Sequence, residues 1–352
     1  MNLIHPSVEL LNIEDPELKL ERCMRICYKS EDKISEGSAA KIIKAIISRG
    51  HLSTTEHFRI RVMCDGKVEA AVREYQDRTH TSFIRILDEG DYDYSYTLEG
   101  NLRAFYEMSN SQHMPFEIKI PLLQCLHEAV PSVSRDWSEN DYKRSEVDFS
   151  CVKYAGESKD YFTVKVVTDR GVLGQFVRHR TLSPSVESTR YCNYLNHGIT
   201  MCLPEPFLWS PCDNFDDWVY KVIDYWFDDP DYETKIRNIF ITEDGQILHR
   251  GIVELVSLVK RQTIWETSCS IDELMYNRMI TCGATPQEAR TVLPMSHKVE
   301  FVMTGTYDAW EHFIVLRNDR AADPQIRIIA QDILKLMEEH KMLHQPFNNE
   351  EN

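Results

Sequence analysis

The sequence predicts a mixed α/β protein, because segments with the two-residue period of strands alternate along the chain with segments that have the apolar spacing of helices. The strand-like segments lie near residues 54–62, 161–168 and 299–303. Helical spacing is found at 38–49 and again in the turns that lead to residue 317. A chain of 352 residues is long enough to bury a large core around such elements.

The first clear helix is predicted at residues 38–49, where isoleucine and alanine recur at helical spacing. It is expected to end at Gly50, because glycine readily adopts the left-handed conformation that follows many helices. His51 should therefore lie just beyond a helix end. The preceding residues 18–30 are compatible with either a strand or a helix.

A strand is expected from Thr54, with side chains that alternate between two faces. The core face carries Phe58, Ile60 and Val62, and the polar face carries His57, Arg59 and Arg61. Asp65 and Gly66 indicate a turn after this strand.

The residues that follow this turn contain two further helical patterns, at 67–78 and 117–130. Residues 88–100 lie between them and are acidic and rich in tyrosine. We interpret them as an exposed loop in preference to a lid over a substrate site.

Residues 175–194 concentrate arginine, histidine and serine, which favours a site for anions and planar rings. The strand at 161–168 is expected to lead into a short helix that Asp169 caps and that begins at Gly171. This helix would deliver the basic residues at 178–180.

Arg178, His179 and Arg180 are consecutive, and consecutive helical residues point about 100° apart. One helix cannot aim all three at a single ligand, so we expect them to serve different groups. Gln175 lies one turn before His179 on the same face, which suits an amide that reads the edge of a pyrimidine.

Pro184 disfavours helical geometry at the preceding residue, so the chain is expected to become extended there. Alternation then places Val186, Ser188 and Arg190 on one side and Glu187 on the other. A serine beside an arginine, as with Ser188 and Arg190, can bind a phosphate.

The C-terminal part contains a capping box that begins at Thr285 and places Arg290 in the second turn of a helix. A later helix carries an apolar stripe of Trp310, Phe313 and Ile314, and Arg317 occupies the next position of that stripe.

Composition excludes several classes of function. The formal net charge of −16 argues against general nucleic-acid binding. Ten irregularly spaced cysteines include only Cys23 and Cys27 as a close pair, so we predict reduced thiols and no metal site. No apolar leader and no run long enough to cross a bilayer is found, and we expect no membrane partner and a cytoplasmic protein.

These motifs together resemble the signature of the flavin-dependent thymidylate synthases. The signature is the Arg-His-Arg triplet at 178–180, followed by Glu-Ser-x-Arg-Tyr at 187–191. Four further segments resemble other parts of that family: 25–30, 51–57, 288–294 and 312–317. The pieces occur in the order that the family requires, over about two thirds of the chain.

The resemblance implies an antiparallel sheet core surrounded by helices, in one catalytic domain over 1–352 with insertions at about 66–160 and 210–268. It also implies the reductive methylation of dUMP to dTMP. Methylenetetrahydrofolate would donate the carbon, and FAD reduced by NADPH would carry the hydride. Such enzymes are homotetramers whose subunits share active sites.

The resemblance also assigns residues. FAD binding falls to Ser53, Arg178, His179, Arg180 and His312. Binding of dUMP falls to Gln175, Glu187, Ser188, Arg190, Arg290 and Arg317. Two residues are expected to take part in catalysis: His51 supports folate and hydride handling, and Arg317 activates the uracil ring.

Three positions depart from the family pattern. Val186 replaces a glutamine or glutamate, and Thr306 and Asp308 replace an asparagine and an arginine near the flavin. These departures keep two alternatives open: a pyrimidine nucleotide hydroxymethylase with the same fold, and a nucleotide-binding homologue without catalysis.

Overall fold

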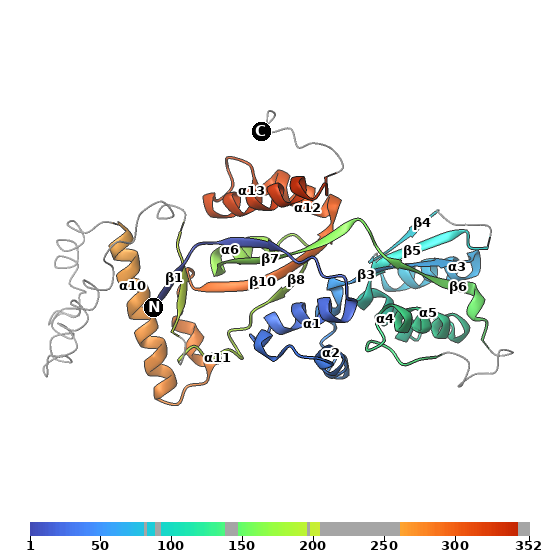
Figure 1. The fold of residues 1–352 in the computed structure, drawn as a ribbon, viewed down its shortest axis with the longest axis horizontal. Coiled ribbons are helices and arrows are strands. Elements are labelled where there is room, and N and C mark those ends of the chain that lie inside the picture. Colours follow the sequence, from blue (N-terminus) through green and yellow to red (C-terminus); the bar gives the residue numbers. More distant parts are fainter. Residues whose placement is uncertain (81–82, 89–92, 138–146, 196–197, 205–260, 344–352) are drawn as a thin grey trace, which may run out of the picture. The chain divides into compact units, whose positions relative to one another are not determined.

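The computed structural model describes residues 1–80, 83–88, 93–137, 147–195, 198–204 and 261–343 (Figure 1). Its contacts divide the chain into two compact units that interleave along the sequence. Unit 1 comprises Met1–Pro6, Asp169–Gly171 and Thr189–Lys298, and unit 2 comprises Ser7–Thr168, Val172–Ser188 and Val299–Asn352. The arrangement of the chain as one domain with insertions stays a prediction.

The predicted fold class, a mixture of helices and antiparallel sheet, is confirmed. Unit 2 contains a four-stranded sheet with the strand order β2-β7-β10-β8. The strands are β2 (Ser7–Leu10), β7 (Tyr161–Asp169), β10 (Lys298–Thr306) and β8 (Ser183–Val186). β2 pairs antiparallel with β7, and β8 pairs antiparallel with β10.

Helices cover both faces of this sheet (Figure 1). On one face, α12 (Tyr307–Arg317) and α13 (Pro324–Glu339) pack against the strands, and Trp310 is fully buried in that layer. On the other face, Val302 of β10 packs with α1 (Pro16–Ile26), on which α2 (Ser38–Ser48) lies. Because helices cover both faces, the β10 side chains that point to one face and those that point to the other are both buried.

A second sheet in unit 2 has the strand order β4-β5-β3-β6. It joins β3, which precedes the predicted first insertion, to three strands from within that insertion. All neighbouring strands are antiparallel. In chain order the elements are β3 (Arg59–Cys64), α3 (Gly66–Thr79), β4 (Ile84–Leu87), β5 (Tyr96–Asn101), α4 (Leu102–Asn110), α5 (Phe116–Ala129) and β6 (Val152–Glu157). This order and pairing is the split βαβ arrangement.

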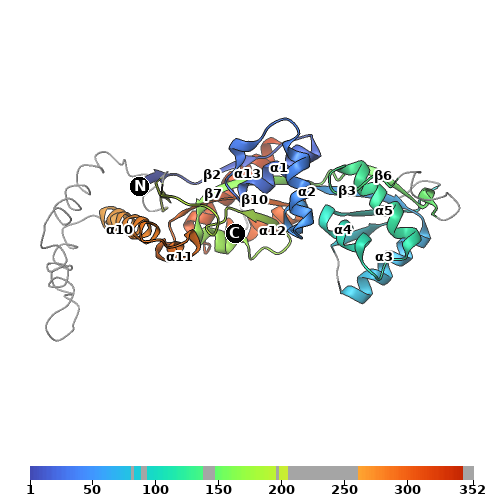
Figure 2. The ribbon, with the colours of Figure 1, turned by 90° about the horizontal axis from the view of Figure 1, so that it is seen from below.

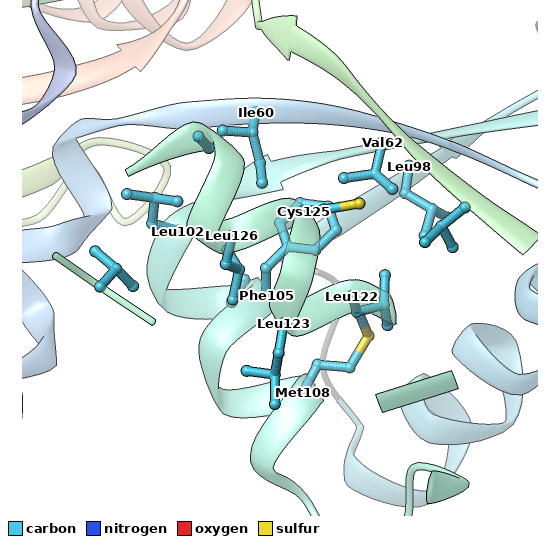
Figure 3. Close-up of a cluster of buried hydrophobic side chains, with 14 of the residues drawn as sticks. Ile60, Val62, Leu98, Leu102, Phe105, Met108, Leu122, Leu123, Cys125 and Leu126 are labelled. Carbon is cyan, nitrogen blue, oxygen red and sulfur yellow. The ribbon is translucent and has the colours of Figure 1, made fainter. Parts of the chain in front are cut away.

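The three helices of this insertion cover one face of its sheet (Figures 1 and 2). Figure 3 shows Ile60, Val62 and Leu98 of the strands meeting Phe105 and Leu126 of the helices. These side chains are fully buried. The predicted helices at 67–78 and 117–130 and the predicted core face of β3 are therefore confirmed.

Several local predictions in this region were wrong. Residues 54–57 do not extend the strand but form a 3₁₀ helix, η2 (Leu52–His57). Asp65 does not form a turn but caps α3, because its Oδ1 accepts a hydrogen bond from the Val68 amide over 2.9 Å. Residues 96–100 do not lie in an exposed loop. They belong to the internal strand β5, which pairs with β3 on one side and with β4 on the other.

Unit 1 is smaller and holds the N-terminal strand. β1 (Asn2–Ile4) pairs parallel with β9 (Thr200–Cys202). The helical elements are α10 (Arg261–Thr281), α11 (Pro286–Ala289) and the 3₁₀ helix η5 (Arg290–Val292). Their buried core includes Met201, Tyr276 and Ala289. Most of the second predicted insertion lies outside the described residues.

No helix in the described ranges is long and apolar enough to cross a membrane.

Candidate active site

The Arg-His-Arg triplet does not lie on a helix, contrary to the prediction. α6 (Arg170–Phe176) ends two residues before it, and the triplet follows in a tight turn. The His179 amide donates to the carbonyl oxygen of Phe176 over 3.0 Å. This turn directs His179 into the protein, where it is 7 % exposed, and leaves Arg178 and Arg180 exposed. The predicted divergence of the three side chains is present, although a turn and not a helix produces it.

His179 and Arg317 are joined directly. The Arg317 Nε donates to the Nε2 of His179 over 2.9 Å, and its Nη2 donates to the carbonyl oxygen of Gln175 over 3.4 Å. An Nε2 that accepts this bond must be unprotonated, so the imidazole is neutral and carries its proton on Nδ1. Burial, followed by the charges of Arg317 and His312, lowers the pKa of His179 to about 4.

The helix that carries Arg317 is anchored in the core. Arg317 is the last residue of α12, and Trp310, Phe313 and Ile314 are buried. The Phe313 ring also meets the His179 ring edge-on, with 4.9 Å between centroids. Arg317 is half-buried, and neither of these two hydrogen bonds uses its Nη1. One edge of a rigidly held guanidinium therefore stays available for a ligand.

The two exposed arginines of the triplet have no ion-pair or hydrogen-bond partner in the part of the chain that the structure describes. His312 is also exposed on α12, and its ring centroid lies 6.4 Å from that of His179. Val177 and Val315, next to these polar groups in sequence, are apolar and exposed. Free guanidinium groups beside apolar side chains can receive a ligand that combines phosphates with a planar ring.

His51, the N-cap residue of η2, and Ser53 of η2 lie at the surface. The Nδ1 of His51 is 3.3 Å from the hydroxyl of Tyr28, and Ser53 is exposed. Both residues are therefore accessible, as a role toward a cofactor or co-substrate requires.

His57, predicted on a polar face, is instead fully buried. It holds η2 against the sheet with the strand order β2-β7-β10-β8. Its Nδ1 lies 2.8 Å from the Thr304 Oγ1, and its Nε2 lies 2.7 Å from the Ser185 Oγ. Burial, with a smaller contribution from the charge of Lys19, lowers the pKa of His57 to about 3. Sequence reasoning missed this role because both partners lie far away along the chain.

Glu187 points into the protein, on the side opposite Val186 and Ser188, as the alternation predicted. Its carboxylate is 1 % exposed, accepts a hydrogen bond from the Glu300 amide over 3.1 Å and lies 3.7 Å from the Lys29 Nζ. The Ser188 amide donates to the carbonyl oxygen of Cys27 over 3.1 Å. The C-terminal end of α1 therefore fixes the start of the predicted phosphate-binding segment. Segment 25–30 was singled out only for its family resemblance, and its contact with Ser188 was not predicted.

Within unit 1, the structure brings the two other predicted dUMP arginines close to each other. The Arg190 Nε donates to the Gln287 Oε1 over 3.1 Å, and the Arg290 Nη1 donates to the Thr189 Oγ1 over 3.4 Å. Both arginines are exposed. The predicted capping box of Thr285 is confirmed, but the α-helix ends at Ala289, and Arg290 begins η5 instead of a second α-helical turn.

Among the described residues, no group of three or more histidine, cysteine, aspartate or glutamate side chains could hold a metal ion.

Comparison with known proteins decides the family. The model of the thymidylate synthase complementing protein family matches residues 159–341, which is more than half of the chain. The chain belongs to this family. The match contains the triplet, the segment 187–191 and Arg317, and it confirms the resemblance inferred from the motifs.

Individual flavin-dependent thymidylate synthases match over shorter segments. A flavin-dependent thymidylate synthase of Mycobacteroides abscessus is 34 % identical over 86 residues, which cover 22 % of this chain and 34 % of that protein. One from Mycobacterium tuberculosis is 45 % identical over 49 residues, which cover 14 % of this chain and 20 % of that protein. The chain thus spans only about a third of the length of the first relative and about a fifth of the length of the second.

A solved structure is similar over most of its length but at low identity. It is a UMP/dUMP methylase, PolB from Streptomyces cacaoi, bound with 5-Br dUMP. The sequence identity is 14 % and the TM-score is 0.36, over 96 % of this chain and 93 % of that chain.

Proposed function

We propose that this protein is a flavin-dependent thymidylate synthase. It would convert dUMP to dTMP with methylenetetrahydrofolate as carbon donor and with hydride supplied by NADPH through FAD. The observation that carries the proposal is the Arg317 guanidinium, which His179 and the Gln175 carbonyl hold in place with one edge unused. Membership of the family supports the proposal.

The role proposed for Arg317 follows from the chemistry of uracil. Carbon 5 becomes nucleophilic when negative charge builds on the ring nitrogen and oxygens, and a fixed guanidinium beside those atoms stabilises that charge. Arg317 keeps its own proton throughout. His179 is neutral and accepts from Nε, so it orients the guanidinium without adding a charge that would compete with it.

The residues around the triplet fit FAD, because Arg178 and Arg180 are exposed and available for a diphosphate. His312 and Ser53 are exposed as well and would contribute polar contacts to the same cofactor. When bound, FAD supplies hydride chemistry that no protein side chain provides. The side chains would bind the cofactor and keep it oriented.

The remaining predicted residues receive separate roles in the proposal. Arg190 and Arg290, two exposed guanidinium groups of unit 1, would bind the phosphate of dUMP. The Gln175 amide would read the edge of the uracil ring, and the Ser188 hydroxyl would bind the nucleotide. Glu187 would act inside the protein by positioning Ser188, because its carboxylate is buried against Lys29.

His51, exposed just before η2, is proposed to assist folate and hydride handling. A cytoplasmic homotetramer with shared active sites completes the proposal. The outward direction of Arg178 and Arg180, opposite to His179, suits binding of a group that extends beyond one subunit. Light scattering of the active protein should give the mass of a tetramer.

The visible absorption spectrum of the purified protein tests the proposal. We expect a yellow protein with bound FAD, and we expect NADPH to bleach this absorption in the presence of dUMP. A colourless protein that does not bind added FAD would be incompatible with a flavin-dependent reaction.

A further inference from the structure

The insertion sheet presents a face that α3, α4 and α5 do not cover (Figures 1 and 2). Strand alternation places Arg59 and Arg61 of β3 on this face, opposite the buried Ile60 and Val62. In the register of the sheet, Glu99 of β5 lies beside both Arg61 and Arg85, and Met63 lies beside Lys153. We call the set Arg59, Arg61, Arg85 and Lys153 the basic face.

Charge on the basic face is not balanced by its own carboxylate. Glu99 lies 3.8 Å from the Arg59 guanidinium, but it also accepts a hydrogen bond from the Ser158 hydroxyl over 2.5 Å. Arg85 and Lys153 are exposed and make no ion pair within the described residues. Arg61 makes a further interaction, so the excess of positive charge consists of Arg85 and Lys153, in a chain whose formal net charge is −16.

Arg59 carries the clearest sign of an unmet interaction. Its side chain is 14 % exposed, and its buried Nε has no hydrogen-bond partner among the described residues. Burial is the main cause that lowers the pKa of Arg59. The charge of Glu99 opposes this shift, and the charge of Arg85 adds to it. A ligand with negative charge on this face would reduce the repulsion between Arg59 and Arg85.

The chemistry of the basic face favours carboxylates over nucleic acid. The described strands carry no aromatic residue on this face, since Tyr96 and Tyr154 pack on the helix side. One exposed ring, Phe83, directly precedes β4, and a single ring cannot stack a series of bases. Single-stranded nucleic acids are held by stacking on aromatic side chains as well as by charge. Guanidinium groups alone match a series of carboxylates, each of which can accept two parallel hydrogen bonds.

The position of the basic face points to one source of such carboxylates. Arg59 lies two residues after η2, and His51, the residue proposed for folate handling, immediately precedes η2. The Arg103 Nη1 at the start of α4 bonds to the Glu56 Oε1 of η2 over 2.7 Å, which ties the insertion to that segment. The basic face therefore begins beside the expected folate segment.

We propose that the basic face binds the γ-linked oligoglutamate chain of a polyglutamylated folate co-substrate. Each added glutamate contributes one carboxylate, and alternate residues of a strand, such as Arg59 and Arg61, lie about 7 Å apart along it. A chain of carboxylates can therefore follow successive cations. The inference rests on the proposed function, since it concerns the same co-substrate.

The test uses the full-length protein and a fluorescently labelled penta-γ-glutamate, whose binding is measured by fluorescence anisotropy. The double variant Arg85→Gln/Lys153→Gln removes two exposed cations of the basic face. The control variant Arg73→Gln/Arg78→Gln removes two exposed cations from α3 and changes the net charge equally. We expect the first variant to weaken binding at least about tenfold, since hydrogen bonds to charged groups are lost, and the control to bind like the wild type.

Kinetics provide a second readout. With monoglutamyl methylenetetrahydrofolate, the basic-face variant should keep the wild-type KM, whereas with the pentaglutamyl form its KM should rise. Equal binding of penta-γ-glutamate by all three proteins, or no binding by any, would overturn the inference. The inference would also be overturned if a single-stranded oligonucleotide of equal charge displaced the labelled probe as effectively as unlabelled penta-γ-glutamate. Anisotropy requires no turnover, so a failure of the proposed function would appear separately as the absence of dTMP.

Discussion

Arg317 donates a 2.9 Å hydrogen bond from its Nε to the Nε2 of His179, and the two residues lie 138 positions apart in the sequence. The bond joins the end of α12 to the turn that follows α6. It also fixes the protonation state of the imidazole, because a protonated Nε2 could not accept it. His179 and Arg317, which belong to separate sequence motifs, are therefore joined in the structure.

Replacement of Arg317 should slow turnover without loss of the fold. Removal of one electrostatic donor to a developing anion typically costs about a hundredfold to a thousandfold in rate, and we expect Arg317→Ala to lose kcat by about that factor. Arg317→Lys should recover only part of it, because an ammonium cannot present two parallel donors. Arg320→Ala, at a nearby exposed position, is the control. Normal turnover in both Arg317 variants, or loss of FAD from both, would refute the role.

The pKa of His179 should depend on Arg317. Burial is the largest cause of the lowered value of about 4, and the charge of Arg317 is the next. In Arg317→Met we expect the pKa to rise but to stay below 6.5, because burial remains. NMR titration of the imidazole in both proteins measures the change. An unchanged or lower pKa in the variant would contradict this electrostatic coupling.

Stability should fall at acidic pH because of His57. Its pKa is lowered from 6.5 to about 3, so between these values the unfolded chain binds a proton that the folded protein does not. The free energy of unfolding therefore decreases as the pH falls below about 6.5, with a slope that approaches about 1.4 kcal/mol per pH unit for one such group. His179 contributes in the same direction.

His57→Gln removes this group, and urea titrations at several pH values compare the slopes. We expect the dependence of unfolding free energy on pH to be shallower in the variant. An identical slope in both proteins would mean that His57 does not titrate as its burial requires.

Lys29 and Glu187 should be energetically coupled. The Lys29 side chain is 40 % exposed, so solvent weakens the attraction to the buried carboxylate. A double-mutant cycle with Lys29→Met and Glu187→Gln is expected to give a coupling on the order of 1 kcal/mol in unfolding free energy. We also expect Glu187→Gln to raise the KM for dUMP while FAD content is retained, because Ser188 follows it directly. A KM for dUMP equal to that of the wild type would leave Glu187 with only a structural role.

Elements with strong local patterns could be predicted from the sequence. The isoleucine spacing identified α2, the alternation identified β7 and the core face of β3, and the capping box of Thr285 located the start of α11. In each case the determining residues lie within a few positions of one another.

Elements that depend on distant partners could not be predicted in this way. β5 is a strand because β3 and β4 pair with it on both sides, although its flanking residues are acidic and suggested a loop. His57 is buried because it bonds Thr304, which lies 247 positions away. The motifs identified His179 and Arg317 individually, but only their arrangement in space revealed the bond between them and the neutral imidazole.

Mass spectrometry of the nucleotide product tests the central claim most directly. Purified protein would be incubated with dUMP, methylenetetrahydrofolate, FAD and NADPH, and the product compared with a reaction that lacks the folate. We predict dTMP in the complete reaction and unchanged dUMP in the control. Recovery of only dUMP from a protein that binds FAD and the nucleotide, or formation of a hydroxymethylated nucleotide in place of dTMP, would contradict thymidylate synthesis as its activity.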